Sequence, residues 1–151
     1  ALLNSFFPLI IEVLILSGSI KLGSYIHISA YNGIYGKFGV CLEDFTGLSP
    51  RCTIFSATDD FSGQNMVGPM MDEEDTDVSV GEVVLKKYSQ IGSGTIILPE
   101  VIIGEGVAVG SMSLINKSLP EWTICYGAPA KPIKSRSKNI LELAKKYYGS
   151  K

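Results

Sequence analysis

The feature that most constrains this chain is a six-residue repeat of aliphatic side chains between residues 85 and 119. Isoleucine, leucine or valine recurs at every sixth position, at Leu85, Ile91, Ile97, Ile103, Val109 and Ile115. A small or β-branched residue stands four positions after each of the first five, at Ser89, Thr95, Val101, Val107 and Ser113. A period of six matches neither an α-helix nor a half-buried strand. It predicts a parallel β-helix, in which each hexapeptide forms one flat face of a triangular coil.

The same repeat extends back toward the beginning of the chain. Aliphatic residues lie six apart at Ile10, Leu16, Leu22, Ile28 and Ile34. The repeat then shifts by two residues and resumes at Leu42, Leu48 and Ile54, with Thr46, Cys52 and Thr58 in the small positions. A shift of two keeps the alternation of inward and outward side chains, so it predicts a bulge. Residues 33–39, which include three glycines, are the expected site of that bulge.

The repeat is absent from residues 59–84. A loop of this length inside a compact domain is usually functional, and we expect it to be extruded from the coil. It holds eight of the fifteen acidic residues and no lysine or arginine. The alternating carboxylates and central glycine of an EF-hand are missing, so a solvated acidic surface is favoured over a calcium site.

After Leu119 the coil is expected to end, because two prolines in residues 127–132 remove strand hydrogen-bond donors. Residues 137–148 predict a short amphipathic helix that Ser137 caps. The expected buried stripe of this helix is Ile140, Leu143, Ala144 and Tyr147. The predicted organisation is therefore a β-helix domain over residues 1–136, with the extruded loop at 59–84, and a C-terminal helix over 137–151 packed on the same domain.

Composition narrows the class of protein further. With 151 residues the chain is long enough for one domain with a sizeable core. A formal net charge of −2 gives no general attraction for nucleic acid. The apolar run at residues 6–16 is about half the ~20 residues that span a bilayer, so no membrane span is expected. Cys41, Cys52 and Cys125 have no metal-ligand spacing, and an odd number of free thiols indicates the cytoplasm.

Three parts of the sequence together resemble the hexapeptide-repeat acyltransferases. They are the repeats, the loop start DDFSG at 59–63 and the ending YGAPAKPIK at 126–134, and the resemblance covers nearly the whole chain. Within that family the chain looks most like the sugar O- and N-acetyltransferases of bacterial surface-polysaccharide pathways. The resemblance implies an all-β, left-handed parallel β-helix, acetyl-CoA as co-substrate, and a homotrimer with active sites in the clefts between neighbouring coils. The outward side chains of Ile96, Ile102 and Leu114 would be partly buried in that trimer, since apolar surface is costly to leave in water.

The resemblance also implies a set of coenzyme A contacts. They are Ser93 and Ser111 beside the pantetheine arm, Asn116 and Lys117 further along the cleft, and Lys131 and Lys134 at the phosphates. Lysine suits this last role because it presents a point charge to phosphate.

The candidate general bases lie elsewhere in the chain. His27, the only histidine, is the sixth residue of its hexad and is expected to point outward, near Ser29 and Tyr31, which match sugar-contacting segments of the family. An imidazole with a pKa of ~6.5 suits general-base catalysis at neutral pH. Asp59 and Asp60 are the alternative bases, at the start of the loop where the family's catalytic segment begins. His27 and Asp59 are expected at different corners of the triangle, so they would meet only across a trimer cleft.

The sequence therefore predicts transfer of acetyl from acetyl-CoA to a hydroxyl of a sugar or sugar-containing acceptor, in surface-polysaccharide (O-antigen or capsule) biosynthesis. An amino group of a nucleotide-linked amino sugar is the alternative acceptor, since an amine needs less help from a base. A non-catalytic trimeric scaffold is a third possibility. A zinc-dependent β-helical carbonic anhydrase is excluded because it needs three histidines, and no metal site is expected.

Overall fold

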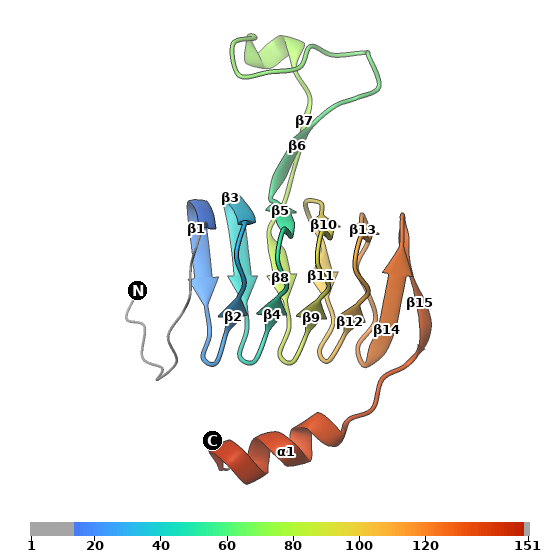
Figure 1. Ribbon diagram of the computed structural model, residues 1–151. Helices are drawn as coiled ribbons and strands as arrows, with labels where there is room; N and C mark the ends of the chain where they lie inside the picture. Colours follow the sequence, from blue (N-terminus) through green and yellow to red (C-terminus); the bar gives the residue numbers. More distant parts are fainter. Residues whose placement is uncertain (1–13, 150–151) are drawn as a thin grey trace.

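The computed structural model describes residues 14–149, and its main body is a parallel β-helix (Figure 1). One sheet forms a single face of the coil from β2 (His27–Ile28), β4 (Gly47–Leu48), β9 (Gln90–Ile91), β12 (Ala108–Val109), β14 (Thr123–Gly127) and β15 (Ala130–Ser135). A second sheet wraps around the other two faces and contains β1 (Leu14–Leu22), β3 (Asn32–Leu42), β5 (Thr53–Phe55), β8 (Val83–Leu85), β10 (Ile96–Ile97), β11 (Ile102–Ile103) and β13 (Leu114–Ile115). It wraps because β3 pairs with β5 through its first part and with β8 through its last part. The predicted β-helix is confirmed.

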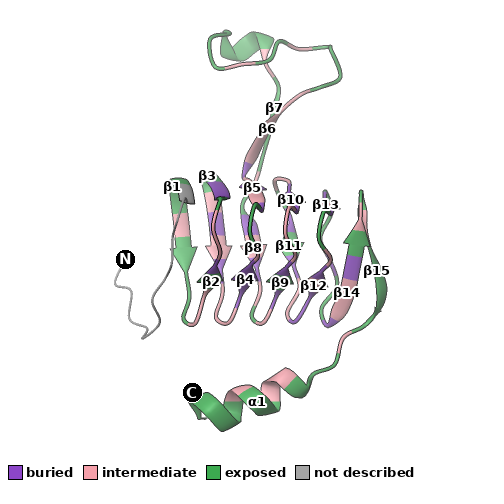
Figure 2. Ribbon diagram, in the orientation of Figure 1, coloured by how far each residue is buried: buried purple, intermediate pink, exposed green. Residues whose placement is uncertain are grey.

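Three columns of inward side chains fill the coil, and the strand register aligns the members of each column. The columns are Ile28, Leu48, Ile91, Val109 and Cys125; Ile34, Ile54, Ile97 and Ile115; and Leu42, Leu85, Ile103 and Leu119. All of them are buried (Figure 2). Each fully buried aliphatic side chain contributes roughly 1.5–3 kcal/mol, so the columns are the main source of stability.

The first coil of the described chain departs from this burial. Leu16 and Leu22 are in register with Ile34 and Leu42 but are 48% and 41% exposed. Among the described residues they have a neighbouring coil on one side only. The repeat member Ile10 and most of the apolar run at 6–16 lie outside the described residues.

The small residues of the repeat are buried at the corners, where the chain turns from one face to the next. Those confirmed are Thr46, Cys52, Ser89, Thr95, Val101, Val107 and Ser113. The residue before each of them has a left-handed φ, for example 60° at Phe45 and 62° at Arg51. The expectation for Thr58 is wrong, because the chain leaves the coil two residues earlier, at the buried Ser56, whose hydroxyl donates to the Tyr35 carbonyl.

The predicted bulge lies where the glycines are. Gly18 in β1 pairs with Gly36 in β3, but the next pair is Ile20 with Val40, so β3 holds two extra residues between them. A Cβ on Gly18 would lie 2.4 Å from the Gly36 backbone, which explains why glycine stands there. The shift of two is confirmed.

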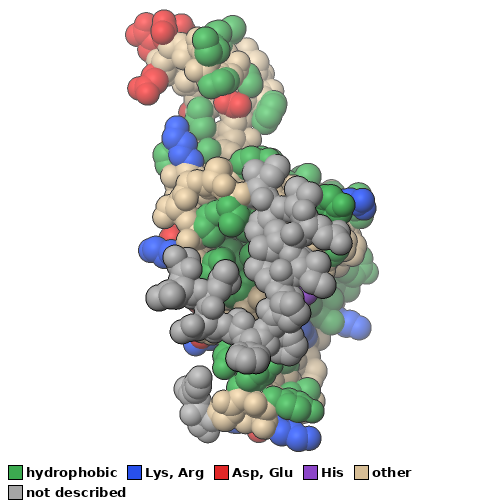
Figure 3. Space-filling model, turned by 60° about the vertical axis from the view of Figure 1, so that its left-hand side comes forward, with side chains coloured by type: hydrophobic (Ala, Val, Ile, Leu, Met, Phe, Trp, Pro, Cys, Tyr) green, Lys and Arg blue, Asp and Glu red, His purple; other side chains and the backbone are tan. Residues whose placement is uncertain are grey.

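The acidic segment is extruded from the coil as expected, but it is an ordered hairpin with different bounds. Its stalk is the antiparallel pair β6 (Ala57–Asp59) and β7 (Val78–Val80), and its outer part holds a short 3-10 helix, Glu73–Asp75 (Figure 1). The repeat already resumes at Val83, which pairs with Val40. Carboxylates and hydrophobic side chains lie together at its outer end (Figure 3).

The expectation that the coil ends after Leu119 is wrong. Strand β14 continues the sheet, with Cys125 opposite Val109, and β15 folds back antiparallel to it. Pro132 is tolerated because β15 is the edge strand, and because the register shifts between Ile124 and Cys125.

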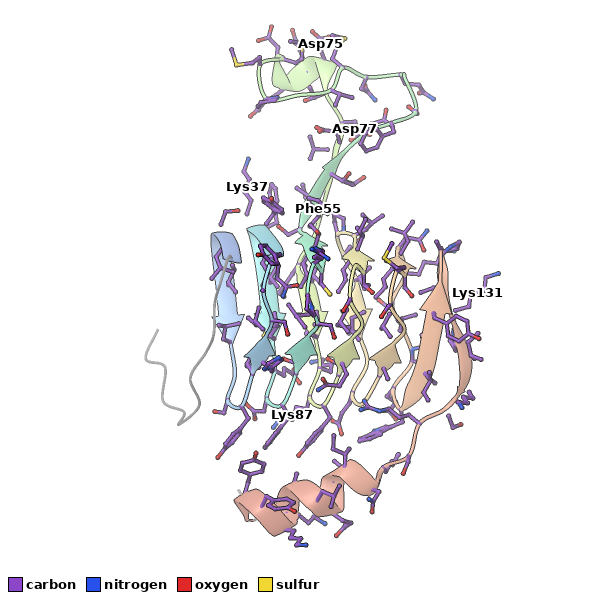
Figure 4. All side chains as sticks on the ribbon, in the orientation of Figure 1. Lys37, Phe55, Asp75, Asp77, Lys87 and Lys131 are labelled. Atoms are coloured by element: carbon purple, nitrogen blue, oxygen red, sulfur yellow. The ribbon has the colours of Figure 1, made fainter. Side chains whose placement is uncertain are left out.

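The C-terminal helix α1 (Asn139–Tyr148) begins two residues after the predicted cap. Ser137 Oγ accepts a hydrogen bond from the Asn139 N–H, but the N-cap residue is Lys138, which makes no side-chain cap bond. The prediction of a buried stripe is also wrong, since no residue of α1 is buried. The helix runs below the corner that carries Lys87 (Figure 4), where the Tyr148 ring contacts the rings of Tyr25 and Phe45. Two grooves lie between α1 and the coil beside this contact. Within residues 14–149 no helix is long and apolar enough to cross a membrane.

Candidate functional site

The three corners of the coil carry different side chains. The serine corner, which follows β2, β4, β9 and β12, consists of residues 29–31, 49–51, 92–94 and 110–112. The hairpin corner follows β5, β10 and β13 and includes the base of the hairpin and residues 116–117. The aromatic corner consists of Tyr25, Phe45, Tyr88, Gly106 and Trp122.

The serine corner presents one continuous strip of small side chains. Backbone N–H groups of Ser29, Ser49, Gly92 and Gly110 each donate to the carbonyl of the next coil at 2.8–3.0 Å, which fixes these residues in one row. Tyr126 continues the row in β14. Because Ser29, Ser49, Gly92 and Gly110 have small side chains or none, this edge of the coil leaves room for an extended ligand.

Four residues predicted from the sequence lie together on this strip. Ser29 and Tyr31 are at its first turns, and Ser93 and Ser111 lie on the turns after β9 and β12. The Met112 N–H donates to the Ser93 carbonyl at 2.8 Å, which links these two turns.

The two lysines expected at the phosphates are in different places. Lys131 pairs with Tyr126, so it stands at the far end of the strip and is exposed (Figure 4). Lys134 pairs with Ile124, three residues further along β15, which is about 10 Å away at the usual rise of a strand. Only Lys131 is at the serine corner.

Four other predicted residues lie at the hairpin corner. Asn116 and Lys117 directly follow β13, while Asp59 and Asp60 lie at the end of β6 in the hairpin stalk. A whole face of the coil, formed by β5, β10 and β13, separates this corner from the serine corner. Within one chain the two sets do not meet.

The two aspartates differ in what their carboxylates do. Asp60 Oδ1 accepts from the Ser62 N–H at 2.8 Å, and Oδ2 accepts from Ser62 Oγ at 2.6 Å and Asn65 Nδ2 at 3.0 Å. These hydrogen bonds hold the pKa of Asp60 below its usual value, chiefly through the Ser62 hydroxyl. A less basic, fully engaged carboxylate makes Asp60 a turn residue and a poor proton acceptor. Asp59 is half-buried beside it and makes no side-chain hydrogen bond to the described residues.

His27 lies on the face between the serine and aromatic corners. It is exposed, as expected, and its Nε2 is 2.9 Å from Ser29 Oγ. It also borders a groove of about 260 Å³ under α1, together with Gln90. The helix residues Ile140, Leu143, Ala144 and Tyr147, expected to be buried, line this groove without filling it.

Two further residues of the serine corner were not singled out from the sequence. Ser49 and Arg51 occupy the same positions in their coil as Ser29 and Tyr31 in the coil before. The Arg51 guanidinium carbon lies 5.7 Å from the centre of the Tyr31 ring. The available signal was the repeat itself, because Ile28 and Leu48 are stacked members of it.

The aromatic corner is structural in character. The Tyr25 and Phe45 rings stack at 4.7 Å and the Phe45 and Tyr88 rings at 5.0 Å. Arg136 Nη1 donates to the carbonyls of Tyr88 at 2.9 Å and Gly106 at 3.0 Å, which fastens the segment before α1 to this corner. Burial lowers the pKa of the Arg136 guanidinium.

Comparison with known proteins gives three informative similarities, while no family model matches the chain. The dTDP-4-amino-4,6-dideoxy-D-glucose acyltransferase of Escherichia coli is 40% identical over 126 residues, which cover 83% of this chain and 66% of the relative. The putative lipopolysaccharide biosynthesis O-acetyl transferase WbbJ of Escherichia coli K12 is 29% identical over 123 residues, 81% of this chain and 60% of the relative. This chain therefore spans less than two thirds of the length of either curated relative.

The third similarity is to a solved structure. AntD, an N-acyltransferase from Bacillus cereus in complex with dTDP and coenzyme A, superposes with a TM-score of 0.88 at 43% identity, covering 91% of this chain and 74% of AntD. Other AntD structures hold dTDP-4-amino-4,6-dideoxyglucose or 3-hydroxybutyryl-CoA. The similarities confirm the expected family and its use of coenzyme A thioesters, and both amine and hydroxyl acceptors occur among the related proteins.

Proposed function

Because this chain belongs to the hexapeptide-repeat acyltransferases that act on sugars, we propose that it transfers an acyl group from a coenzyme A thioester to the amino group of a nucleotide-linked amino sugar. The observation that carries the proposal is the 40–43% identity to two proteins whose names or ligands include coenzyme A and dTDP-4-amino-4,6-dideoxyglucose. The absence of any histidine from the hairpin corner agrees with it, since an amine needs less base assistance than a hydroxyl. Biosynthesis of a surface polysaccharide is the fitting use for such a product.

The acyl-CoA is proposed to lie along the serine corner. Its amide-rich arm would run past Ser93 and Ser111, and its phosphates would meet Lys131 at the end of the strip. An acetyl group is the simplest acyl group for this transfer.

A homotrimer would complete the site. The outward side chains of Ile96 and Ile102 are exposed, and Leu114 stands next to Ile96 on the face beside the hairpin corner. The Tyr35 and Phe55 rings stack at 5.2 Å along that corner, where they add to the same apolar surface. Burying this surface against the next copy would set the hairpin corner of one chain against the serine corner of another.

Asp59 is the proposed base in that shared cleft. A free carboxylate can take a proton from the sugar ammonium or from the amine as it attacks the thioester carbonyl. A C–N bond then forms, the C–S bond breaks, and the departing thiolate of coenzyme A is protonated. Mutants of AntD have been solved at a serine and at an aspartate ten positions later, and Ser49 and Asp59 have the same spacing. His27 is left with a supporting role through its hydrogen bond to Ser29.

The three cysteines fit a reducing compartment such as the cytosol, where acyl-CoA and nucleotide sugars are made. Cys41, Cys52 and Cys125 are all unpaired thiols, and Cys52 and Cys125 are buried.

The test is turnover of a defined acceptor. The protein is incubated with acetyl-CoA and dTDP-4-amino-4,6-dideoxyglucose. A colorimetric thiol assay measures the release of free coenzyme A, and mass spectrometry identifies the acylated sugar. Asp59→Asn should lower kcat by ~10²–10⁴, whereas Asp60→Asn, its matched neighbour, should cost much less. Acetylation only of the matching sugar that carries a hydroxyl in place of the amine would favour the hydroxyl acceptor. A protein that binds no coenzyme A and turns over neither sugar would support a scaffold and contradict the proposal, because a scaffold has no reason to retain coenzyme A binding.

A further inference from the structure

We infer that Tyr31 and Arg51 form the subsite for the nucleotide diphosphate half of the acceptor. The inference rests on the proposed function: the sequence already indicates Tyr31 as a sugar contact, and the structure adds Arg51 beside it. It identifies Arg51 as the phosphate contact and Tyr31 as the platform for the base.

The two residues form a single rigid unit. They occupy equivalent corner positions on adjacent coils, with φ values of 61° and 62°. The Arg51 N–H donates to the Ala30 carbonyl at 3.2 Å, which holds the two turns together. The Arg51 guanidinium carbon lies 5.7 Å from the Tyr31 ring centre, within the range of a cation–π contact.

The guanidinium of Arg51 is available to a ligand. The ion pairs among the described residues join Lys86 with Glu43, Lys87 with Asp44 and Lys145 with Glu142, and none involves Arg51. Its side chain is exposed, and no protein acceptor engages it in the described part of the chain. A planar guanidinium with five donors matches phosphate oxygens two at a time, which a lysine cannot do.

The strip has one cation at each end. Arg51 belongs to the coil of Leu48, and Lys131 pairs with Tyr126 in the coil of Cys125. Lys131 itself lies in β15, so four strand spacings separate it from the coil of Arg51, or about 19 Å at ~4.8 Å per spacing. With Lys131 assigned to the phosphates of coenzyme A, the Arg51 end is left for a second phosphate-bearing ligand. Two anionic substrates then enter from opposite ends, and their reacting groups meet between Ser49 and Ser93.

Tyr31 fits the remaining part of a nucleotide. Its ring is 52% exposed, so a planar base can stack on it while Arg51 contacts the diphosphate. Stacking of a base on an aromatic ring is a substantial and sequence-tolerant source of affinity. The pair therefore selects nucleotide-linked sugars over free sugars.

The experiment measures binding of dTDP and of coenzyme A to the full chain by calorimetry, with turnover of dTDP-4-amino-4,6-dideoxyglucose measured in parallel. Arg51→Gln should weaken dTDP binding about tenfold or more, because one charged hydrogen-bonded contact corresponds to at least that factor. Tyr31→Ala should weaken it about tenfold and Tyr31→Phe very little. The affinity for coenzyme A should change by less than about twofold in these variants, because losing a direct contact with coenzyme A would weaken its binding by about tenfold.

Lys87→Gln is the matched control, since it removes one positive charge at the aromatic corner, far from the strip, where Lys87 pairs with Asp44. It should leave dTDP affinity unchanged. Undiminished dTDP affinity in Arg51→Gln, or a loss of coenzyme A affinity instead, would overturn the inference while turnover by the wild-type protein keeps the proposed function intact. A wild-type protein that neither binds dTDP nor turns over the sugar would overturn both.

Discussion

Placing a methyl group at two glycines of the coil separates backbone strain from side-chain packing. Gly106 and Gly94 occupy equivalent corner positions, with φ values of 65° and 71°. A Cβ added to either would lie 2.5 Å from a side-chain atom, the Trp122 ring in one case and the Met112 sulfur in the other. The two substitutions to alanine thus carry the same backbone cost and the same initial overlap.

The neighbours differ in how easily they can move. Met112 is 77% exposed, and its flexible thioether can swing into solvent. Trp122 is 8% exposed, with Tyr88 at 6.4 Å and the Lys138 ammonium at 5.2 Å from its ring. A left-handed backbone costs alanine about 1 kcal/mol relative to glycine, and overpacking a buried ring costs about 1–3 kcal/mol more. We expect Gly94→Ala to lose about 1 kcal/mol of unfolding free energy and Gly106→Ala about 2–4 kcal/mol.

Urea denaturation followed by fluorescence gives both values, because Trp122 is the only tryptophan in the chain. Both variants are compared at one protein concentration, since the proposed trimer would make stability depend on it. The emission of Gly106→Ala should also shift to longer wavelength in the native state as the ring moves toward water. Equal losses in the two variants would refute the reasoning, because the cost would then lie in the backbone and not in the aromatic corner.

Three further predictions concern charged groups. Arg136→Met should lower the unfolding free energy by about 2–3 kcal/mol because it leaves two partly buried carbonyls without their donor. The same change at the exposed Arg51, measured by the same denaturation, should cost less than about 1 kcal/mol. Asp60 has a depressed pKa in the folded hairpin, so its support of the local turn is fully present above its unfolded pKa of ~3.9 and is lost as the pH falls through the lower folded value. The protection of the hairpin amides against hydrogen exchange, measured at several values from about pH 5 to about pH 2.5, should fall with this loss, and that range follows from the carboxyl pKa. Asp60→Asn should remove the pH dependence of this protection. Lys131→Ala should weaken coenzyme A binding in a salt-dependent way and Lys134→Ala much less, since only Lys131 is on the strip; equal losses in a binding titration would contradict that placement.

The six-residue repeat predicts most of the coil correctly because it reflects a local geometry of the chain. A side chain at every sixth position can only be buried repeatedly if the chain turns through three equal faces, so Ile91, Ile97 and Ile103 each identify their own face. The prediction failed where long-range pairing overrode a local rule. The local rule makes Pro132 a strand breaker, but an edge strand needs no donor on its free side, and β15 forms such an edge.

The C-terminal helix shows the same limit. Its amphipathic pattern indicated which side chains would face the coil, and these line the groove beneath α1. Whether that groove is filled depends on how far α1 stands from the coil. This distance is set by the Tyr148 ring, whose centre lies 4.5 Å from that of Tyr25 and 5.4 Å from that of Phe45. No pattern within the helix contains that information.

By itself, then, the sequence determined the β-helix, the position of its bulge, the extrusion of the acidic segment and the family, because each follows from a repeat or motif that is local in the chain. The tertiary structure alone decided which candidate residues share a site. The coil turns every six residues through a third of a circle, so Ser29 and Gly92 come into one row although 63 positions separate them, while Lys131 and Lys134 diverge although only three do. Stacking of the coils, and not distance along the chain, sets Arg51 beside Tyr31 and places Asp59 at another corner, in the hairpin stalk.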